Sequence, residues 1–173
     1  GCDEGLFEDI SSEIASMGVP GPNGESIAED MENNGLEYHS GWDCCVPQIF
    51  WTYVVFYDPD AFPGEKPDSM ADFFDTEKFP GKRGIHTWST GIIEKAMIAD
   101  GVKPSAVPTV LANQTGAIDR AFEVLDRIKD DVVFWSAGSQ PLELVKSGEV
   151  IMSIADNGRV GAANLAEGEN FEY

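Results

Sequence analysis

The sequence predicts an α/β protein in which helices flank a largely parallel sheet. Segments typical of strands and of helices alternate along most of the chain, and the connections between strands are long enough to hold a helix. The strongest strand signal is apolar on both faces, as in sheets that helices cover on both sides. A chain of 173 residues is also long enough to form a proper hydrophobic core. We therefore expect crossover connections and a sheet buried between helices.

The clearest strand candidate is 49–57, Ile-Phe-Trp-Thr-Tyr-Val-Val-Phe-Tyr, which is rich in aromatic and β-branched residues. Because neither face is polar, we expect it in the middle of the sheet. Further strands are expected at 82–87, 132–135 and 150–155, with the start of another at 171–173. Helices are expected at 69–74, 92–99, 117–129, 141–146 and 158–166. Residues 1–46, rich in Gly, Asn, Glu and Ser, are expected to form short elements on loops.

Acidic residues dominate the charge of the chain. There are 31 Asp and Glu against 11 Lys and Arg, which gives a formal net charge of −20 at pH 7. Because Lys and Arg supply most of the affinity for phosphates, this balance argues against a nucleic-acid partner. The excess of negative charge could serve to attract cationic ligands or to keep the protein soluble, and both roles stay open. No stretch approaches the roughly 20 apolar residues that span a bilayer.

The chain begins Gly1-Cys2-Asp3, without an initiating Met and without the charged and apolar regions of a signal peptide. We expect a cleaved precursor or an excised fragment. The three cysteines, Cys2, Cys44 and Cys45, fit no metal-ligand spacing, so neither a metal ion nor a cofactor is expected. Two states of the cysteines stay open: one disulfide from Cys2 to Cys44 or Cys45, or buried free thiols.

Polar segments follow three of the expected strands, at 87–90, 136–140 and 156–159. In parallel sheets ligands bind outside the carboxyl ends of the strands, so we expect the binding site there. Hydroxyl, amide and glycine residues in these segments also expose backbone N–H groups at the start of the following helix. The candidate ligand-binding residues are Trp51, Trp88, Ser89, Thr90, Trp135, Ser139, Gln140, Asp156, Asn157 and Arg159.

Two roles stay open for each aromatic and charged candidate. Trp51, Trp88 and Trp135 are suited to form aromatic walls around a planar or cationic solute, or else they belong to the core. Asp156 is placed either to pair with a cation or to cap the helix that follows it. Arg159 is placed either to clamp a carboxylate or to pair with Asp156.

Catalytic arrangements are scarce, and the sequence predicts no catalytic residue. His39 and His86 are the only histidines, and no nucleophile elbow of the Gly-x-Ser-x-Gly type accompanies them. His86, at the end of an expected strand, is the better placed of the two to contact a ligand.

Several short motifs occur in a specific order and spacing. They are Met70-Ala71-Asp72-Phe73-Phe74, Phe79-Pro80-Gly81-Lys82-Arg83-Gly84, Ala99-Asp100-Gly101-Val102, Ser147-Gly148-Glu149-Val150 and Asn157-Gly158-Arg159-Val160. Together they resemble the periplasmic solute-binding proteins of ABC importers, and among these the spermidine/putrescine-binding group. The resemblance covers nearly the whole chain.

Members of that family are longer and fold as two α/β lobes that close on a ligand. The resemblance implies that 1–48 is the end of the first-lobe segment and the crossover, 49–157 the second lobe, and 158–173 the start of the return to the first lobe. It also implies a periplasmic or extracellular protein, secreted or lipid-anchored, made as a precursor with a signal peptide. In that compartment a disulfide between Cys2 and Cys44 is favoured over free thiols.

By the same resemblance, the expected function is capture of a small polar solute for import through a membrane permease. The solute would be a polyamine or an amino-acid-like amine, and the protein a monomer without chemistry of its own. Polyamine binders of this group carry acidic residues in the turn corresponding to 87–91, and none of those positions is acidic here. The alternatives are a ligand-sensing domain, or an enzyme of the same architecture, transferase or thiaminase-like, acting through Cys45 or His86.

Overall fold

The computed structural model describes residues 4–20, 24–26, 29, 44, 51–89 and 91–173. The chain forms two compact units, residues 1–50 and residues 51–173. In the first unit, α1 (Ser11–Ser16) buries Ile14, and Pro20 pairs with Ser26 in an isolated bridge. Cys44 is disulfide-bonded. Because Cys2 lies outside the described residues, the pairing of Cys2 with Cys44 stays a prediction.

The second unit is built on a four-stranded sheet with the strand order β1-β4-β2-β3. The strands are β1 (Tyr53–Tyr57), β2 (Arg83–His86), β3 (Val132–Trp135) and β4 (Met152–Asp156). β2 runs parallel to both β3 and β4, whereas β1 runs antiparallel to β4. The expected α/β fold with a largely parallel sheet is therefore confirmed.

β1 lies at one end of the strand order, so its expected place in the middle of the sheet is wrong. On its other side, within the described residues, a single bridge joins Tyr57 to Glu172. Its side chains nevertheless meet the core on both faces, because Val55 packs against one hydrophobic cluster while Val54 and Phe56 belong to another. Two covered faces, rather than two neighbouring strands, explain why this segment is apolar.

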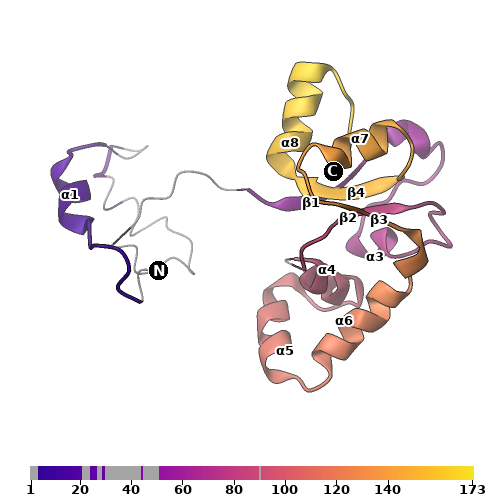
Figure 1. Cartoon of the computed structure of the whole chain (residues 1–173), viewed down its shortest axis with the longest axis horizontal. Helices are drawn as coiled ribbons and strands as arrows, with labels where there is room; N and C mark the ends of the chain where they lie inside the picture. The colour runs from indigo at the N-terminus through magenta and orange to yellow at the C-terminus, as the bar shows by residue number, and fades with distance from the viewer. Residues whose placement is uncertain (1–3, 21–23, 27–28, 30–43, 45–50, 90) are drawn as a thin grey trace. The chain divides into compact units, whose positions relative to one another are not determined.

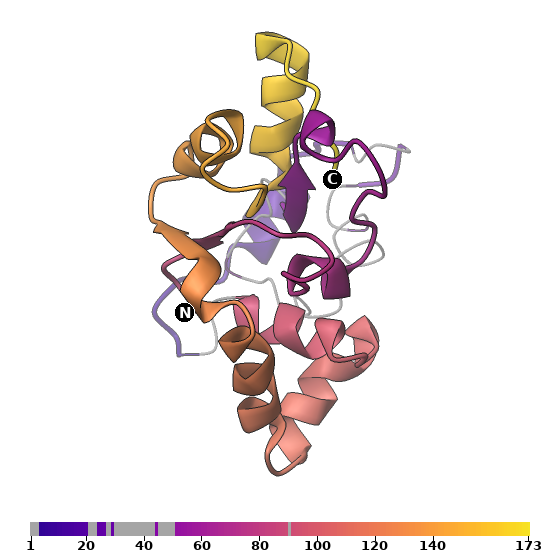
Figure 2. The same cartoon turned by 90° about the vertical axis from the view of Figure 1, so that its right-hand side faces the viewer.

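Helices cover both faces of the sheet, which Figure 1 shows edge-on and Figure 2 shows turned by 90°. On one side lie α3 (Met70–Phe73), α4 (Ile92–Ala99), α5 (Val107–Asn113) and α6 (Ala117–Asp126). On the other side lie α7 (Gln140–Lys146) and α8 (Asn157–Ala162), the latter continuing as a π-helical turn, Ala163–Glu167. Short 3₁₀ turns occupy Pro59–Ala61, Pro104–Ala106 and Lys129–Asp131. Within the described residues, no helix is long and apolar enough to cross a membrane.

The sequence misses α5, while every other helix and strand of this unit overlaps an expected one. The α5 segment contains Pro108 and the β-branched residues Val107, Thr109 and Val110, which all weaken a helix signal. Pro108 is tolerated because it lies in the first turn, where its missing N–H has no partner to lose.

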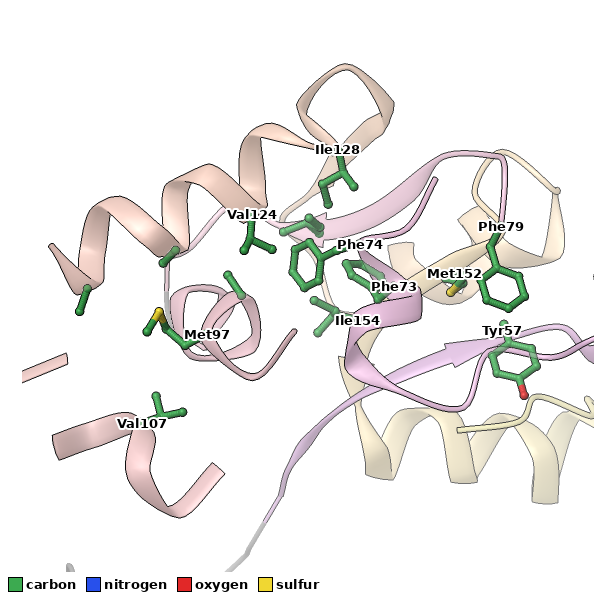
Figure 3. Close-up of a cluster of buried hydrophobic side chains, with 14 of the residues drawn as sticks. Tyr57, Phe73, Phe74, Phe79, Met97, Val107, Val124, Ile128, Met152 and Ile154 are labelled. Carbon is green, nitrogen blue, oxygen red and sulfur yellow. The ribbon is translucent and has the colours of Figure 1, made fainter. Parts of the chain in front are cut away.

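Each side of the sheet has its own hydrophobic cluster. The larger cluster packs α3, α4 and α6 against the sheet, with Phe73, Met97 and Val124 fully buried (Figure 3). The smaller cluster packs α7 and α8 against the other face around Phe56 and Val160. Burying a side chain of this size contributes roughly 1.5–3 kcal/mol, so both clusters hold the helices against the sheet.

Candidate functional site

The carboxyl ends of the three parallel strands lie at one edge of the sheet. They are His86 on β2, Trp135 on β3 and Asp156 on β4. Tyr53, the first residue of the antiparallel β1, lies opposite Asp156 and so belongs to the same edge. The segments predicted to bind a ligand therefore emerge beside one another, as the strand-end rule requires.

His86 lies between two tryptophans at this edge. Its ring makes edge-on contacts with Trp88 and Trp135, with ring centroids 4.8 and 4.4 Å away. The backbone N–H of Trp88 donates a hydrogen bond to Nδ1 of His86 at 2.8 Å. Nδ1 is therefore an acceptor, and the proton of the neutral imidazole lies on Nε2. These contacts fix the ring and the start of the following turn.

The three tryptophan candidates differ in exposure. Trp88 is 67% exposed and Trp51 is 62% exposed, so both side chains are open to contact. Trp135 is only 4% exposed, and its Nε1–H has no hydrogen-bond partner within the described part of the chain. Ser89 is exposed next to Trp88, whereas Thr90 lies outside the described residues.

The loop after β3 is held by Gln140. Its Oε1 atom accepts hydrogen bonds from the backbone N–H groups of Ser136 and Ala137, at 2.8 and 2.7 Å. Ser139, by contrast, is exposed and does not cap α7 with its side chain. Gln140 therefore shapes the loop from within, while the Ser139 hydroxyl stays accessible.

Asp156 occupies the N-cap position of α8, but its side chain makes no capping hydrogen bond. The carboxylate is partly exposed and lies 3.7 Å from Nε of Arg159, too far for a strong hydrogen bond. The Arg159 guanidinium packs over Gly138, where a Cβ would come within 2.5 Å of Nε. Asp156 thus keeps free acceptor capacity at the strand end, with a loosely held arginine beside it.

Asn157 joins α8 to the chain before β1. Its Oδ1 atom accepts a hydrogen bond from the backbone N–H of Thr52 at 3.1 Å, and its own N–H donates to the Thr52 carbonyl oxygen at 2.9 Å. This candidate therefore has a positioning role that the sequence did not suggest.

Lys95 and Tyr53 also belong to this edge, and sequence reasoning missed both. A small pocket of about 10 Å³ is lined by Tyr53, Ile85, His86, Trp88, Ile92, Lys95 and Ile154. The available signal was the position of Lys95 on the apolar face of the 92–99 helix, three residues after Ile92 and one before Ala96.

A larger hollow of about 530 Å³ lies at the opposite end of β1, between Tyr57, Asp68 and Tyr173. It is remote from the carboxyl ends of β2, β3 and β4, so the strand-end rule assigns the ligand to the other edge. Within the described residues, no group of three or more His, Cys, Asp or Glu side chains is placed to hold a metal ion.

The whole chain, residues 1–173, matches the family described as bacterial extracellular solute-binding proteins. The chain belongs to this family. The resemblance found in the motifs is thereby confirmed, and the family consists of extracellular proteins.

One curated relative of this solute-binding protein is the gamma-aminobutyric acid-binding protein of Pseudomonas aeruginosa. It is 38% identical over 163 residues, which make up 94% of this chain and 42% of that protein. The chain therefore spans less than half the length of this relative.

Two solved structures show the same architecture. The Atu4243-GABA receptor has a TM-score of 0.70 and 31% identity over 99% of this chain and 46% of that one. The spermidine/putrescine ABC transporter substrate-binding protein PotD of Streptococcus pneumoniae has a TM-score of 0.68 over 99% of this chain and 48% of that one. At 14% identity the likeness to PotD shows the fold alone.

Proposed function

We propose that the protein is the substrate-binding component of an ABC importer that captures a small amine or amino-acid-like amine. The observation that carries the proposal is the carboxylate of Asp156, which lies at the common strand end without a capping hydrogen bond. A carboxylate with free acceptor capacity and an exposed indole, both at the edge where the parallel strands end, suit an ammonium group. The relative from Pseudomonas aeruginosa, named for the binding of gamma-aminobutyric acid, supports the same class of solute.

In this proposal Trp88 forms an aromatic wall against the solute, and the exposed Ser139 hydroxyl supplies a further polar contact. The protein acts in the periplasm or outside the cell and delivers its solute to a membrane permease. It does no chemistry of its own.

Isothermal titration of the complete protein against polyamines, amino acids and related amines tests the solute class. We expect saturable binding of at least one of these compounds, and an absence of binding across the panel would exclude the amine class. Asp156→Asn should weaken binding about tenfold or more because it removes the charge that faces the ammonium group. Asp119→Asn, which changes an exposed carboxylate on α6, is the matched control and should leave the affinity unchanged.

Trp88→Ala should weaken binding about tenfold by removing the aromatic wall. Phe122→Ala, which removes an aromatic ring that is 55% exposed on α6, is the matched control. Equal affinity in both variants and the parent would show that Trp88 does not contact the solute.

A further inference from the structure

We infer that Lys95 binds a carboxylate group of the solute, so that the solute is a zwitterionic amino acid and not a polyamine. This inference rests on the function proposed above and specifies the class of solute. Lys95 lies within α4, outside the three segments that follow the strands and were expected to bind the ligand.

Lys95 is a buried cation that has no anionic partner among the described residues. The residue is 8% exposed, and its Nζ atom makes one long hydrogen bond, of 3.3 Å, to the carbonyl oxygen of Gly91. An ammonium group carries three donors. Within the described residues no carboxylate lies within 4.0 Å of it, and its other close contact is the Tyr53 ring, with Nζ 5.1 Å from the ring centroid. Most of its hydrogen-bonding capacity is therefore unused.

The position of Lys95 in the helix makes this charge more costly. Lys95 lies one turn after the N-terminus of α4, where the helix dipole is positive and repels a cation. Burial lowers the pKa of Lys95, and the negative charge of Glu94 only partly offsets that effect. Glu94 itself is exposed. A buried charge of this kind that lines a pocket is a candidate binding residue.

The pocket beside Lys95 accepts a single oxygen atom. Its volume, about 10 Å³, is about that needed for one water molecule, and it is lined by Tyr53, His86 and Trp88 as well as Lys95. A carboxylate that places one oxygen there receives a charge-assisted hydrogen bond from Nζ. A second ammonium group of a polyamine would instead be repelled by Lys95.

Lys95 and Asp156 together provide two opposite charges for one solute. Tyr53 and Asp156 are directly opposed in the antiparallel β1–β4 pair, so their side chains are on the same face of the sheet. Lys95 reaches that face over the Tyr53 ring. The two charges do not form an ion pair with each other, because no contact within 4.0 Å joins them in the described structure. A solute with separated ammonium and carboxylate groups satisfies both.

The test compares Lys95→Met with Lys103→Met in the complete protein. Methionine keeps the length of the buried stem, and Lys103 is an exposed control in the same connection. Isothermal titration uses 4-aminobutanoate and 5-aminopentanoate, and also propylamine and butylamine, which lack only the carboxylate. We expect Lys95→Met to weaken binding of the amino acids about 10- to 100-fold and to leave the affinity for the amines unchanged. Equal losses for both series, or no loss for the amino acids, would overturn the inference.

A second measurement separates this inference from the proposed function. If the parent protein binds none of these compounds, the amine class fails, and sodium acetate alone then tests the carboxylate site. Relative to sodium chloride at the same ionic strength, acetate should raise the thermal midpoint of the parent and of Lys103→Met, but not of Lys95→Met. An equal response of all three proteins to acetate would refute the role of Lys95.

Discussion

Ser153 on β4 and Gly84 on β2 contact each other in the buried centre of the sheet. The Ser153 hydroxyl donates a hydrogen bond to the Gly84 carbonyl oxygen at 3.1 Å. A Cβ atom on Gly84 would come within 2.2 Å of Oγ and 2.8 Å of Cβ of Ser153. This close approach requires glycine at position 84.

Gly84→Ala should therefore lower the free energy of unfolding by about 1–3 kcal/mol, because overpacking here displaces backbone on two strands. Urea unfolding measures the loss. Gly161→Ala in α8 is the matched control, since its Cβ would meet nothing closer than 3.8 Å and alanine favours a helix. If the double variant Gly84→Ala with Ser153→Gly is no more stable than Gly84→Ala, the steric explanation is wrong.

Arg83 is fully buried and stabilises the loop between α3 and β2. Its guanidinium donates hydrogen bonds to the carbonyl oxygens of Phe73 and Phe79 at 2.7 Å each, of Asp75 at 3.1 Å and of Gly81 at 2.5 Å. Arg83→Met leaves these acceptors without a donor and should lower the free energy of unfolding by about 3 kcal/mol or more.

The control for Arg83 is Arg127→Met. The side chain of Arg127 is 55% exposed and lies 3.7 Å from Asp100, so its loss should cost no more than about 1 kcal/mol. Both variants are compared by urea unfolding. Similar losses in the two would mean that the buried hydrogen bonds do not stabilise the loop.

Tyr57 makes the folded state less stable as the pH becomes alkaline. Burial, together with a hydrogen bond to Glu172 and the negative charge of that residue, raises the pKa of Tyr57 to about 12. The folded state holds the Tyr57 proton more tightly than the unfolded chain does. The contribution of Tyr57 to the free energy of unfolding is therefore complete below the pKa of tyrosine in the unfolded chain, near 10, and is lost as pH rises towards 12. That contribution amounts to about 2 kcal/mol.

Unfolding measured between pH 9 and about 11.5 checks this pH dependence. Tyr57→Phe should remove the alkaline loss of stability, whereas Tyr173→Phe, at a residue that is 62% exposed, should retain it. Identical pH profiles for the two variants would contradict the prediction.

Gly138→Ala tests how Arg159 affects Asp156. The added Cβ would come within 2.5 Å of Nε and 2.7 Å of Cζ, which are at the far end of a flexible side chain. The guanidinium should move away while the thermal midpoint stays within about 2 °C of the parent. Without this screening cation, Asp156 should bind an ammonium-bearing solute about two- to fivefold more tightly.

Isothermal titration of Gly138→Ala and of Arg159→Met with the same solute should give the same change. Gly158→Ala, where an added Cβ meets nothing within 4 Å, controls for a general effect of alanine near the site. Weaker binding in Gly138→Ala and Arg159→Met would instead assign Arg159 a direct contact with the solute.

Periodicity was enough to predict the layers of the fold but not the order of its strands. The 49–57 segment is apolar because α-helical layers cover both faces of β1, and the same pattern would arise in a central strand. Side-chain composition reports on the faces of a strand and carries little information about its hydrogen-bonded edges. That is why β1 was expected in the middle.

The strand-end rule predicted that the segments after β2, β3 and β4 emerge at one edge of the sheet, because it depends only on parallel topology. It did not predict which side chains serve the fold. Gln140 and Asn157 are polar residues of the expected segments, yet both hold neighbouring backbone. Lys95 was missed for the opposite reason, since it lies within a helix and only tertiary packing shows that its charge is buried without a partner.

The two hydrogen bonds between Asn157 and Thr52 have a mechanical consequence. Asn157 directly follows Asp156, the carboxylate proposed to bind the ammonium group, and Thr52 lies at the start of the second unit. In the proposed function, a movement of Asp156 on binding the solute would reach Thr52 through these two hydrogen bonds. The proposed site and the residue that anchors the start of this unit are thus one peptide bond apart.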